Sequence, residues 1–369
     1  MKFSCEKAIL TQALNLASRT VSPKSSLEVL EGICVRAGYT VQFSGYNLET
    51  GITVGISANV SEGGSCVMPA RLFYDIIRKL PDDMVTITVD DKYRVGVVCG
   101  ISTFSFSALP ADDYPELPDV ESETAVKLTQ ADLRKQITGT LFSASENQAR
   151  PIHTGCLFEV DGDTVTTVAV DGYRLALRRA KLLDHCTMKM RFVVPAPALK
   201  ELEKMLADTD EPASFTPGRK HISFRIGDAT LICRLLEGEF LDWRRVLPEE
   251  NPILLTVKSS AFARVIDRMS LVISEKVKTP VRCVFGDQIA DFRIASTVGT
   301  AHDVCDVAGN GNDLEIGFNC KYLLDAIRAV PDDEVTLELS NALSPIVMTP
   351  CSKDGSYAYM VLPVRLKVD

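Results

Sequence analysis

The chain repeats one pattern three times. Three stretches each read as a strand end, a helix of about three turns, an acidic turn and an alternating strand: VMPARLFYDIIRKLPDDMVTITVDD from Val67, VVPAPALKELEKMLADTDEPASFTP from Val193, and GFNCKYLLDAIRAVPDDEVTLELSN from Gly317. If Leu72, Leu199 and Leu323 are equivalent, the copies lie 127 and then 124 residues apart. A period this long is that of a domain rather than of a solenoid repeat. The sequence therefore predicts three similar domains.

A second helix recurs in the same register, which argues against a chance likeness of amphipathic helices. It opens each third of the chain, as CEKAILTQALNLASRTV from Cys5, TQADLRKQITGTLFSAS from Thr129, and KSSAFARVIDRMSLVISEK from Lys258. Between the two helices lie alternating segments with turn residues, which are typical of antiparallel meanders with one buried face. We expect an α+β fold in which each third packs two helices on antiparallel sheets of roughly eight strands.

The apolar positions of the helices fall at helical spacing, for example Leu72, Ile76, Ile77 and Leu80 in the first copy. Pro- and acid-rich segments separate the thirds, LPADDYPELPDVESE at 109–123 and VLPEENP at 246–252. We therefore expect domains over 1–120, 125–247 and 249–369.

Composition limits the class of protein. A net charge of −9 argues against a nucleic-acid-binding protein that relies on overall basicity. No apolar run reaches the ~18 residues of a membrane span, and MKFSCEKAIL lacks the apolar core of a secretory signal, so we expect a cytoplasmic location. The eleven cysteines lie in apolar contexts without a CxxC pair, which favours buried reduced thiols over disulfides or zinc ligands.

The predicted helices are more basic than the rest of the chain. Lys and Arg outnumber Asp and Glu by 16 to 11 in the six helix windows 5–20, 69–80, 129–144, 195–211, 258–278 and 319–330. Basic helices on an acidic body suit a protein whose helices face phosphate. Solvated Lys and Arg are also common on helices of any function, so both interpretations stay open.

Motifs of common enzymes are absent. The sequence has no GxxxxGK[ST], GxGxxG, HExxH or GxSxG. Its four histidines lack further ligands at zinc spacing, and its acidic pairs lie in turns, where Asp is favoured by local hydrogen bonds. We expect no catalytic residues, no metal and no cofactor. A metal-dependent nuclease could still use carboxylates dispersed in the sequence.

Several motifs resemble the bacterial DNA polymerase III beta subunit, the sliding clamp, over the whole length of the chain. Besides the threefold helix pattern, they are VAVDGYRLALRR at 168–179, FLDWRRVLP at 240–248, LPADDYPELP at 109–118 and YMVLPVRL at 359–366. The resemblance implies a head-to-tail homodimer whose six domains close into a ring around duplex DNA, with the helices lining the hole. Such a ring is a non-enzymatic processivity factor that tethers the replicative polymerase, and its contacts to phosphate are independent of sequence.

The resemblance also implies a groove between the second and third domains, with the C-terminal segment as one wall. In the family this groove receives short apolar peptide motifs from polymerases, the clamp loader, and repair and translesion proteins. Aliphatic walls would bury a partner's Leu or Phe at about 25 cal/mol per Å², and arginines would fix the polar ends of the peptide. The corresponding residues here are Val170, Gly172, Tyr173, Arg174, Leu175, Leu241, Arg245, Val246, Leu343, Pro345, Met360, Leu362, Pro363, Val364 and Arg365.

Other interpretations of these residues stay open. Met360, Leu362 and Val364 could fill the core of their own domain, although Pro363 is expected at a sheet edge or past the end of a strand. Arg174 and Arg245 could form structural ion pairs, and Gly172 could serve a turn. Val170, Leu241 and His153 stand where the family often has threonine, proline and an aliphatic residue, which bears on the peptide preference.

Two further sets of residues are implied by the resemblance. For DNA they are Lys24 in TVSPKSSL, Asn147, Gln148 and Arg150 in ASENQARP, and the helix residues Arg78, Arg134, Arg264 and Arg268. For ring closure they are Phe104 and Phe106 in STFSFSALP and Leu271 and Val272 in MSLVISEK. Solvated loops and core burial are the respective alternatives.

Two functions from other classes remain beside the sliding clamp. A metal-dependent DNA-processing enzyme on repeated domains would need a cluster of essential carboxylates. A DNA-independent scaffold would keep its function when the basic helix positions are neutralised.

Overall fold

The computed structural model describes residues 1–120, 124–273 and 279–366. By its internal contacts the chain divides into two compact units: Met1–Ala131 with Lys200–Leu235, and Asp132–Leu199 with Leu236–Asp369. The middle third of the sequence contributes to both. The domain boundaries expected from the linkers stay predictions.

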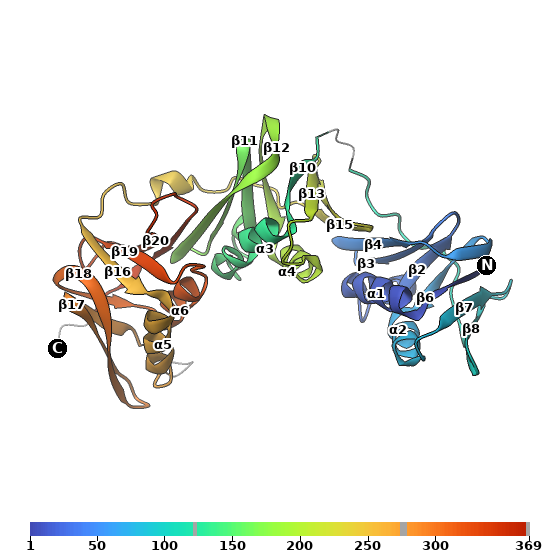
Figure 1. Cartoon of the computed structure of the whole chain (residues 1–369), viewed down its shortest axis with the longest axis horizontal. Helices are drawn as coiled ribbons and strands as arrows, with labels where there is room; N and C mark the ends of the chain where they lie inside the picture. The colour runs from blue at the N-terminus through green and yellow to red at the C-terminus, as the bar shows by residue number, and fades with distance from the viewer. Residues whose placement is uncertain (121–123, 274–278, 367–369) are drawn as a thin grey trace. The chain divides into compact units, whose positions relative to one another are not determined.

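Six α-helices lie within the described part of the chain, one in each window that the sequence predicts (Figure 1). They are α1 Lys7–Ala17, α2 Ala70–Lys79, α3 Gln130–Thr138, α4 Ala196–Met205, α5 Ser259–Ser270 and α6 Cys320–Arg328. The Asn319 side chain caps α6, since its Oδ1 accepts hydrogen bonds from Lys321 N at 3.0 Å and Tyr322 N at 3.3 Å. No helix in the described ranges is long and apolar enough to cross a membrane.

The first unit holds two antiparallel sheets. One has the order β5-β1-β7-β8-β9 and the other β10-β13-β14-β15-β4-β3-β2-β6. The strands are β1 Lys2–Glu6, β2 Gly32–Ala37, β3 Val41–Tyr46, β4 Thr50–Ile56, β5 Asn59–Glu62, β6 Gly64–Pro69, β7 Met84–Val89, β8 Arg94–Cys99, β9 Ser102–Ser107, β10 Val126–Thr129, β13 Pro212–Pro217, β14 His221–Ile226 and β15 Ala229–Arg234.

The buried face of helix α2 agrees with the expected stripe at Ile77 and Leu80 and differs from it at Leu72. Leu72 is 46% exposed, and the buried side chains are Ala70, Phe73 and Ile77, which follow each other at three and four residues. Phe73 packs beside Phe106 of β9, with the ring centroids 6.0 Å apart. In the first turn of the helix Phe73 therefore takes the buried position expected for Leu72.

The second unit is built on one antiparallel sheet in the order β11-β12-β21-β20-β19-β16-β18-β17, with β22 paired to β18. The strands are β11 Gly155–Val170, β12 Arg174–Pro195, β16 Ile253–Lys258, β17 Val281–Ala295, β18 Thr300–Phe318, β19 Glu334–Leu339, β20 Ile346–Pro350, β21 Tyr357–Val361 and β22 Pro363–Val364. The strands β11, β12, β17 and β18 are far longer than those of the first unit. The pairings of β11 with β12 and of β17 with β18 each contain shifts in register, as at Gly162, and the strands continue past these shifts.

One turn recurs at the same place in each third, between β3 and β4, β11 and β12, and β17 and β18. In each case a side-chain oxygen accepts hydrogen bonds from the backbone N–H groups two and three residues on. Asn47 bonds at 3.0 and 2.7 Å, Asp171 at 2.9 and 3.1 Å, and Ser296 at 3.0 and 3.4 Å. The repeat read from the sequence therefore extends to the local hydrogen bonding.

The eleven cysteines are all free, and only Cys351 is exposed. Burial raises the pKa of the Cys66, Cys156 and Cys233 thiols to about 12. The interpretation of the cysteines as buried reduced thiols is confirmed for ten of them.

Candidate functional site

The predicted groove residues come together in the second unit, around the pairing of β12 with β21. In that pairing Arg174 lies opposite Val361 and Leu175 opposite Met360. Val170, Leu175 and Met360 are at most 3% exposed. They belong to one apolar cluster with Leu157, Val168, Leu177, Val193, Phe240, Trp243 and Val347. These three predicted groove residues are therefore buried in the core of the unit.

Other predicted groove residues are more accessible than these three. Tyr173 is 62%, Val246 39%, Leu343 74% and Val364 37% exposed, whereas Leu241 and Leu362 are half-buried and pack on the cluster. We call these six residues the candidate peptide surface. They come from four segments: the β11–β12 turn, the segment 240–247, the turn before β20 and the C-terminal segment.

The C-terminal segment turns away from β21 at Leu362. Leu362 N donates a hydrogen bond to Tyr173 O at 2.8 Å, and the chain then pairs with β18, with Pro363 opposite Phe318 and Val364 opposite Gly317. Pro363 thus lies past the end of β21, as its missing N–H requires. The apolar residues of this tail divide between core and surface, because Met360 is buried and Val364 is exposed.

Arg174 forms ion pairs with two acidic residues of the same chain. Its side chain is 9% exposed, Nε lies 2.9 Å from Asp171 Oδ2, and Nη1 lies 2.6 Å from Asp325 Oδ2 on α6. Its guanidinium also lies 4.5 Å from the centre of the Tyr322 ring. Arg174 therefore ties the β11–β12 turn to α6.

The remaining predicted groove residues are more loosely held. Arg245 is 87% exposed and lies 3.2 Å from Asp242, while Arg365 is exposed and Pro345 half-buried. Gly172 has φ +92°, and a Cβ there would meet nothing within 4 Å, so its backbone conformation rather than space favours glycine.

Sequence reasoning missed Tyr322 at the edge of this surface, although it named His153. Tyr322 of α6 stacks on Tyr173, with the ring centroids 6.1 Å apart and an interplanar angle of 25°. His153 packs edge-on against Phe240 at 5.3 Å, and burial, followed by the nearby Arg150, lowers the pKa of His153. No motif marked Tyr322, since only the fold brings α6 beside residue 173.

The residues expected to contact DNA are all exposed: Lys24, Arg78, Arg134, Asn147, Gln148, Arg150, Arg264 and Arg268. Two of the arginines form local ion pairs. Arg78 lies 2.9 Å from Asp75, and Arg268 lies 2.6 Å from Asp303, an interaction that lowers the pKa of the Asp303 carboxyl. Neighbouring acids thus offset part of the positive charge of the helices.

The residues expected to close a ring differ in exposure. Phe104 on β9, the last strand of its sheet, is 45% exposed and Phe106 is half-buried against Phe73. Leu271, just after α5, is 78% exposed, whereas Val272 packs partly on the core. Residues 95–110, which include β9, carry no charged side chain. A charge-free edge strand is unusual in a protein that works alone.

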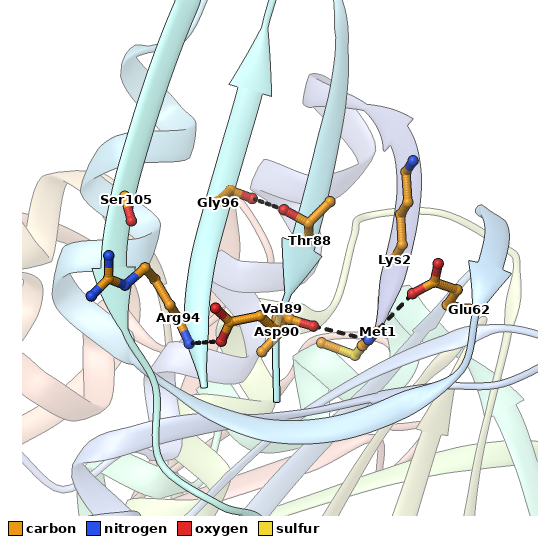
Figure 2. A pocket seen from close by; sticks show the side chains of 9 residues that line it. All are labelled: Met1, Lys2, Glu62, Thr88, Val89, Asp90, Arg94, Gly96 and Ser105. Carbon is orange, nitrogen blue, oxygen red and sulfur yellow. Dashed lines mark hydrogen bonds and ion pairs between the residues drawn. The ribbon is translucent and has the colours of Figure 1, made fainter. Parts of the chain in front are cut away.

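The first unit has an open hollow of about 410 Å³ beside the N-terminus, and Figure 2 shows its nine lining residues. The Met1 ammonium donates a hydrogen bond to Val89 O at 3.0 Å and lies 3.9 Å from the Glu62 carboxylate, while Asp90 accepts from Arg94 N at 2.9 Å. These charges are used in structural contacts. Within the described ranges, no group of three or more His, Cys, Asp or Glu residues could hold a metal ion.

Comparisons with known proteins cover nearly the whole chain. Family models for the DNA polymerase III beta subunit match residues 1–118 with the N-terminal domain, 127–242 with the central domain and 244–365 with the C-terminal domain. The "Beta sliding clamp" of Staphylococcus aureus is 32% identical over 376 residues, which cover 99% of each chain.

Solved structures agree with the sequence relatives. The DNA polymerase sliding clamp of Bacillus subtilis, at 28% identity, superposes over the full length of both chains with a TM-score of 0.94. A Pseudomonas aeruginosa DnaN sliding clamp bound to griselimycin is also 28% identical, with a TM-score of 0.94 over 99% of this chain and 100% of that one. The predicted clamp fold, three similar domains of helices on antiparallel sheets, is thereby confirmed, and the chain belongs to the DNA polymerase III beta subunit family, the bacterial sliding clamps.

Proposed function

We propose that this chain is the sliding clamp of a replicative polymerase: two copies close head to tail around duplex DNA and hold the polymerase on it. Three consecutive family matches that span the chain carry this proposal. Sliding clamps are processivity factors and not enzymes, so the ring has no turnover of its own. Its hold on DNA is topological, and its contacts to phosphate are weak and independent of sequence.

The decisive experiment is retention on nicked circular DNA at high salt, after loading by a cognate clamp loader with ATP. Retention that is lost when the circle is linearised establishes topological linkage. Release from both forms, with the loader active on a control clamp, contradicts the ring. The scaffold without a DNA role would then be favoured.

For ring closure, we propose that the exposed Phe104 of β9 in one copy meets Leu271 of the other. The charge-free stretch 95–110 supports this, because such an edge would otherwise promote aggregation. We expect Phe104→Arg and Leu271→Arg each to convert dimer to monomer in sedimentation velocity, whereas Leu183→Arg, at an exposed leucine of β12, leaves the dimer intact. Dimers in all three variants would contradict this assignment.

We further propose that the candidate peptide surface receives short apolar segments of the polymerase, the clamp loader and the repair and translesion polymerases. The supporting observations are that half-buried Leu241 and Leu362 pack on one apolar cluster, and that Tyr173, Val246, Leu343 and Val364 are exposed. Exposed apolar side chains that lie together mark interaction sites, and this is the arrangement that we propose for the six residues. The griselimycin complex of a relative is consistent with a surface of this family that binds small ligands.

Fluorescence anisotropy with a short labelled peptide that carries Leu and Phe tests this surface. We expect Val364→Glu to weaken binding roughly tenfold, since it places a charge where apolar area should be buried. Leu183→Glu is the matched control, an exposed apolar residue of the same unit, and should bind like the parent protein. Equal affinity of parent and Val364→Glu would place the peptide elsewhere.

A further inference from the structure

Glu159 on β11 joins the segment 240–247 to the sheet beneath it. Its side chain is 14% exposed. One carboxylate oxygen, Oε2, accepts hydrogen bonds from Trp243 Nε1 at 3.1 Å and from Arg244 Nη2 at 2.9 Å. The other oxygen, Oε1, lies 3.3 Å from Arg191 Nε of β12. One carboxylate therefore meets donors from the segment and from the neighbouring strand.

The same donors hold the segment at further points. Arg191 Nη2 donates a hydrogen bond to Phe240 O at 3.2 Å, and the Arg244 guanidinium lies 4.2 Å from the centre of the Trp243 ring. The side chains of Phe240 and Trp243 are each 3% exposed and belong to the apolar cluster below the candidate peptide surface. The segment is thus fixed on its inner side by both packing and charge.

The same segment carries three of the predicted groove residues. Leu241 lies between the anchored Phe240 and Trp243 in the chain, and Arg245 and Val246 follow directly after Arg244. Between β15 and β16 the only regular structure is the short 3-10 turn Trp243–Arg245, so backbone hydrogen bonds alone do not fix the segment. Side chains on such a segment keep a defined position only when tertiary contacts supply it.

We propose that Glu159 is a positioning residue for peptide binding: its carboxylate holds Trp243 and Arg244, and through them presents Leu241 and Val246 to the incoming peptide. This inference rests on the proposed function of the candidate peptide surface. Glu159 itself makes no contact with the peptide. Its effect is transmitted by the backbone of the segment, in which Trp243 and Arg244 lie directly between Leu241 and Val246.

The test compares two acid-to-amide variants on the same strand. Glu159→Gln keeps the shape of the side chain but removes its charge and replaces one of its two acceptor oxygens by an NH2 group. That group must face either the donors of Trp243 and Arg244 or the donor of Arg191, so the variant disrupts the anchor. Asp161→Asn is the matched control. Asp161 lies on β11 two residues after Glu159, its side chain is 67% exposed, and it forms an ion pair with Lys189 at 2.8 Å. We expect the labelled peptide to bind Glu159→Gln roughly tenfold more weakly, and Asp161→Asn within about twofold of the parent protein.

Trp243 provides a second readout, because it is the sole tryptophan of the chain. Its emission reports the anchor directly, so Glu159→Gln should change the emission spectrum of the folded protein while Asp161→Asn leaves it unchanged. Arg244→Gln, at a side chain that is 61% exposed, removes one anchor without touching the core and should weaken binding less than Glu159→Gln. This second variant decides the question if Glu159→Gln does not fold.

The outcomes separate the two proposals. A parent protein that fails to bind the peptide refutes the proposed surface. A parent protein that binds, with Glu159→Gln and Arg244→Gln both indistinguishable from Asp161→Asn, refutes the positioning role while the surface stands. Weaker binding together with changed Trp243 emission supports it.

Discussion

Arg174 was expected to contact the polar end of a peptide, but its contacts predict a different effect. Arg174→Met keeps an unbranched stem beside Phe142 and Tyr322 and removes the guanidinium. The carboxylates of Asp171 and Asp325 then lose their shared partner, at 12% and 28% side-chain exposure. Removing one member of a fully buried pair costs about 3–5 kcal/mol. Since water reaches Asp325, we expect a loss of about 2–3 kcal/mol here.

Urea unfolding followed by Trp243 emission measures this loss, because the only tryptophan lies in the same unit as Arg174. Arg245→Met is the control: Arg245 is 87% exposed and its pair with Asp242 should contribute less than about 1 kcal/mol. A double-mutant cycle with Asp325→Asn should give a coupling free energy of about 1–2 kcal/mol. A loss for Arg174→Met no larger than that for Arg245→Met would refute the view that Arg174 ties the turn to α6.

Three further predictions follow from individual residues. Gly172→Ala should lower the free energy of unfolding by about 1 kcal/mol, because φ is +92°, whereas Gly55→Ala, also with open space around it, should change it far less; equal effects would refute the conformational explanation. A thiol reagent should modify one cysteine quickly in the native protein, Cys351, and eleven after denaturation; several fast thiols would contradict the burial of the others. The Asp303 carboxyl has a lowered pKa in the folded state because Arg268 binds it, so the pair stabilises the protein above the ordinary pKa of about 3.9 and this contribution is lost as pH falls through the lowered pKa. Arg268→Gln should therefore be slightly less stable than the parent at neutral pH, with a difference that vanishes in acid; a difference independent of pH would exclude the ion pair as its cause.

The helices and the repeat could be predicted because their signals are local. Leu199, Leu202 and Leu206 fall at helical spacing in the sequence and are buried in the structure. The face of α2 could not be read in the same way, since both Leu72 and Phe73 are apolar and only packing against Phe106 selects Phe73. The strand lengths could not be predicted either, because a bulge lets a strand continue where a turn would end it.

The candidate peptide surface likewise contains some residues that could be predicted from the sequence and others that could not. Motif likeness supplied Tyr173, Leu241 and Val364, which are separated by many residues in the chain. It did not supply Tyr322 or Glu159, because their part depends on which strand or helix lies beside residues 173 and 243. Residues that position others have no sequence signal of their own. Such residues are recognised only from the distances between their side chains and those of their partners in the structure.

If Arg78 and Arg268 face DNA as we propose, their ion pairs account for a clamp that holds DNA and still slides along it. Arg78 and Arg268 each have an acidic neighbour within 3 Å, so their charge is shared before any phosphate approaches. Each phosphate contact then gains little free energy and is readily exchanged for the next one along the duplex. A ring that relied on these contacts for affinity would need arginines without acidic neighbours, and their stronger contacts to phosphate would slow its sliding. Paired arginines are suited instead to a ring that topology retains, in which the helices need only repel phosphate less than the acidic body does.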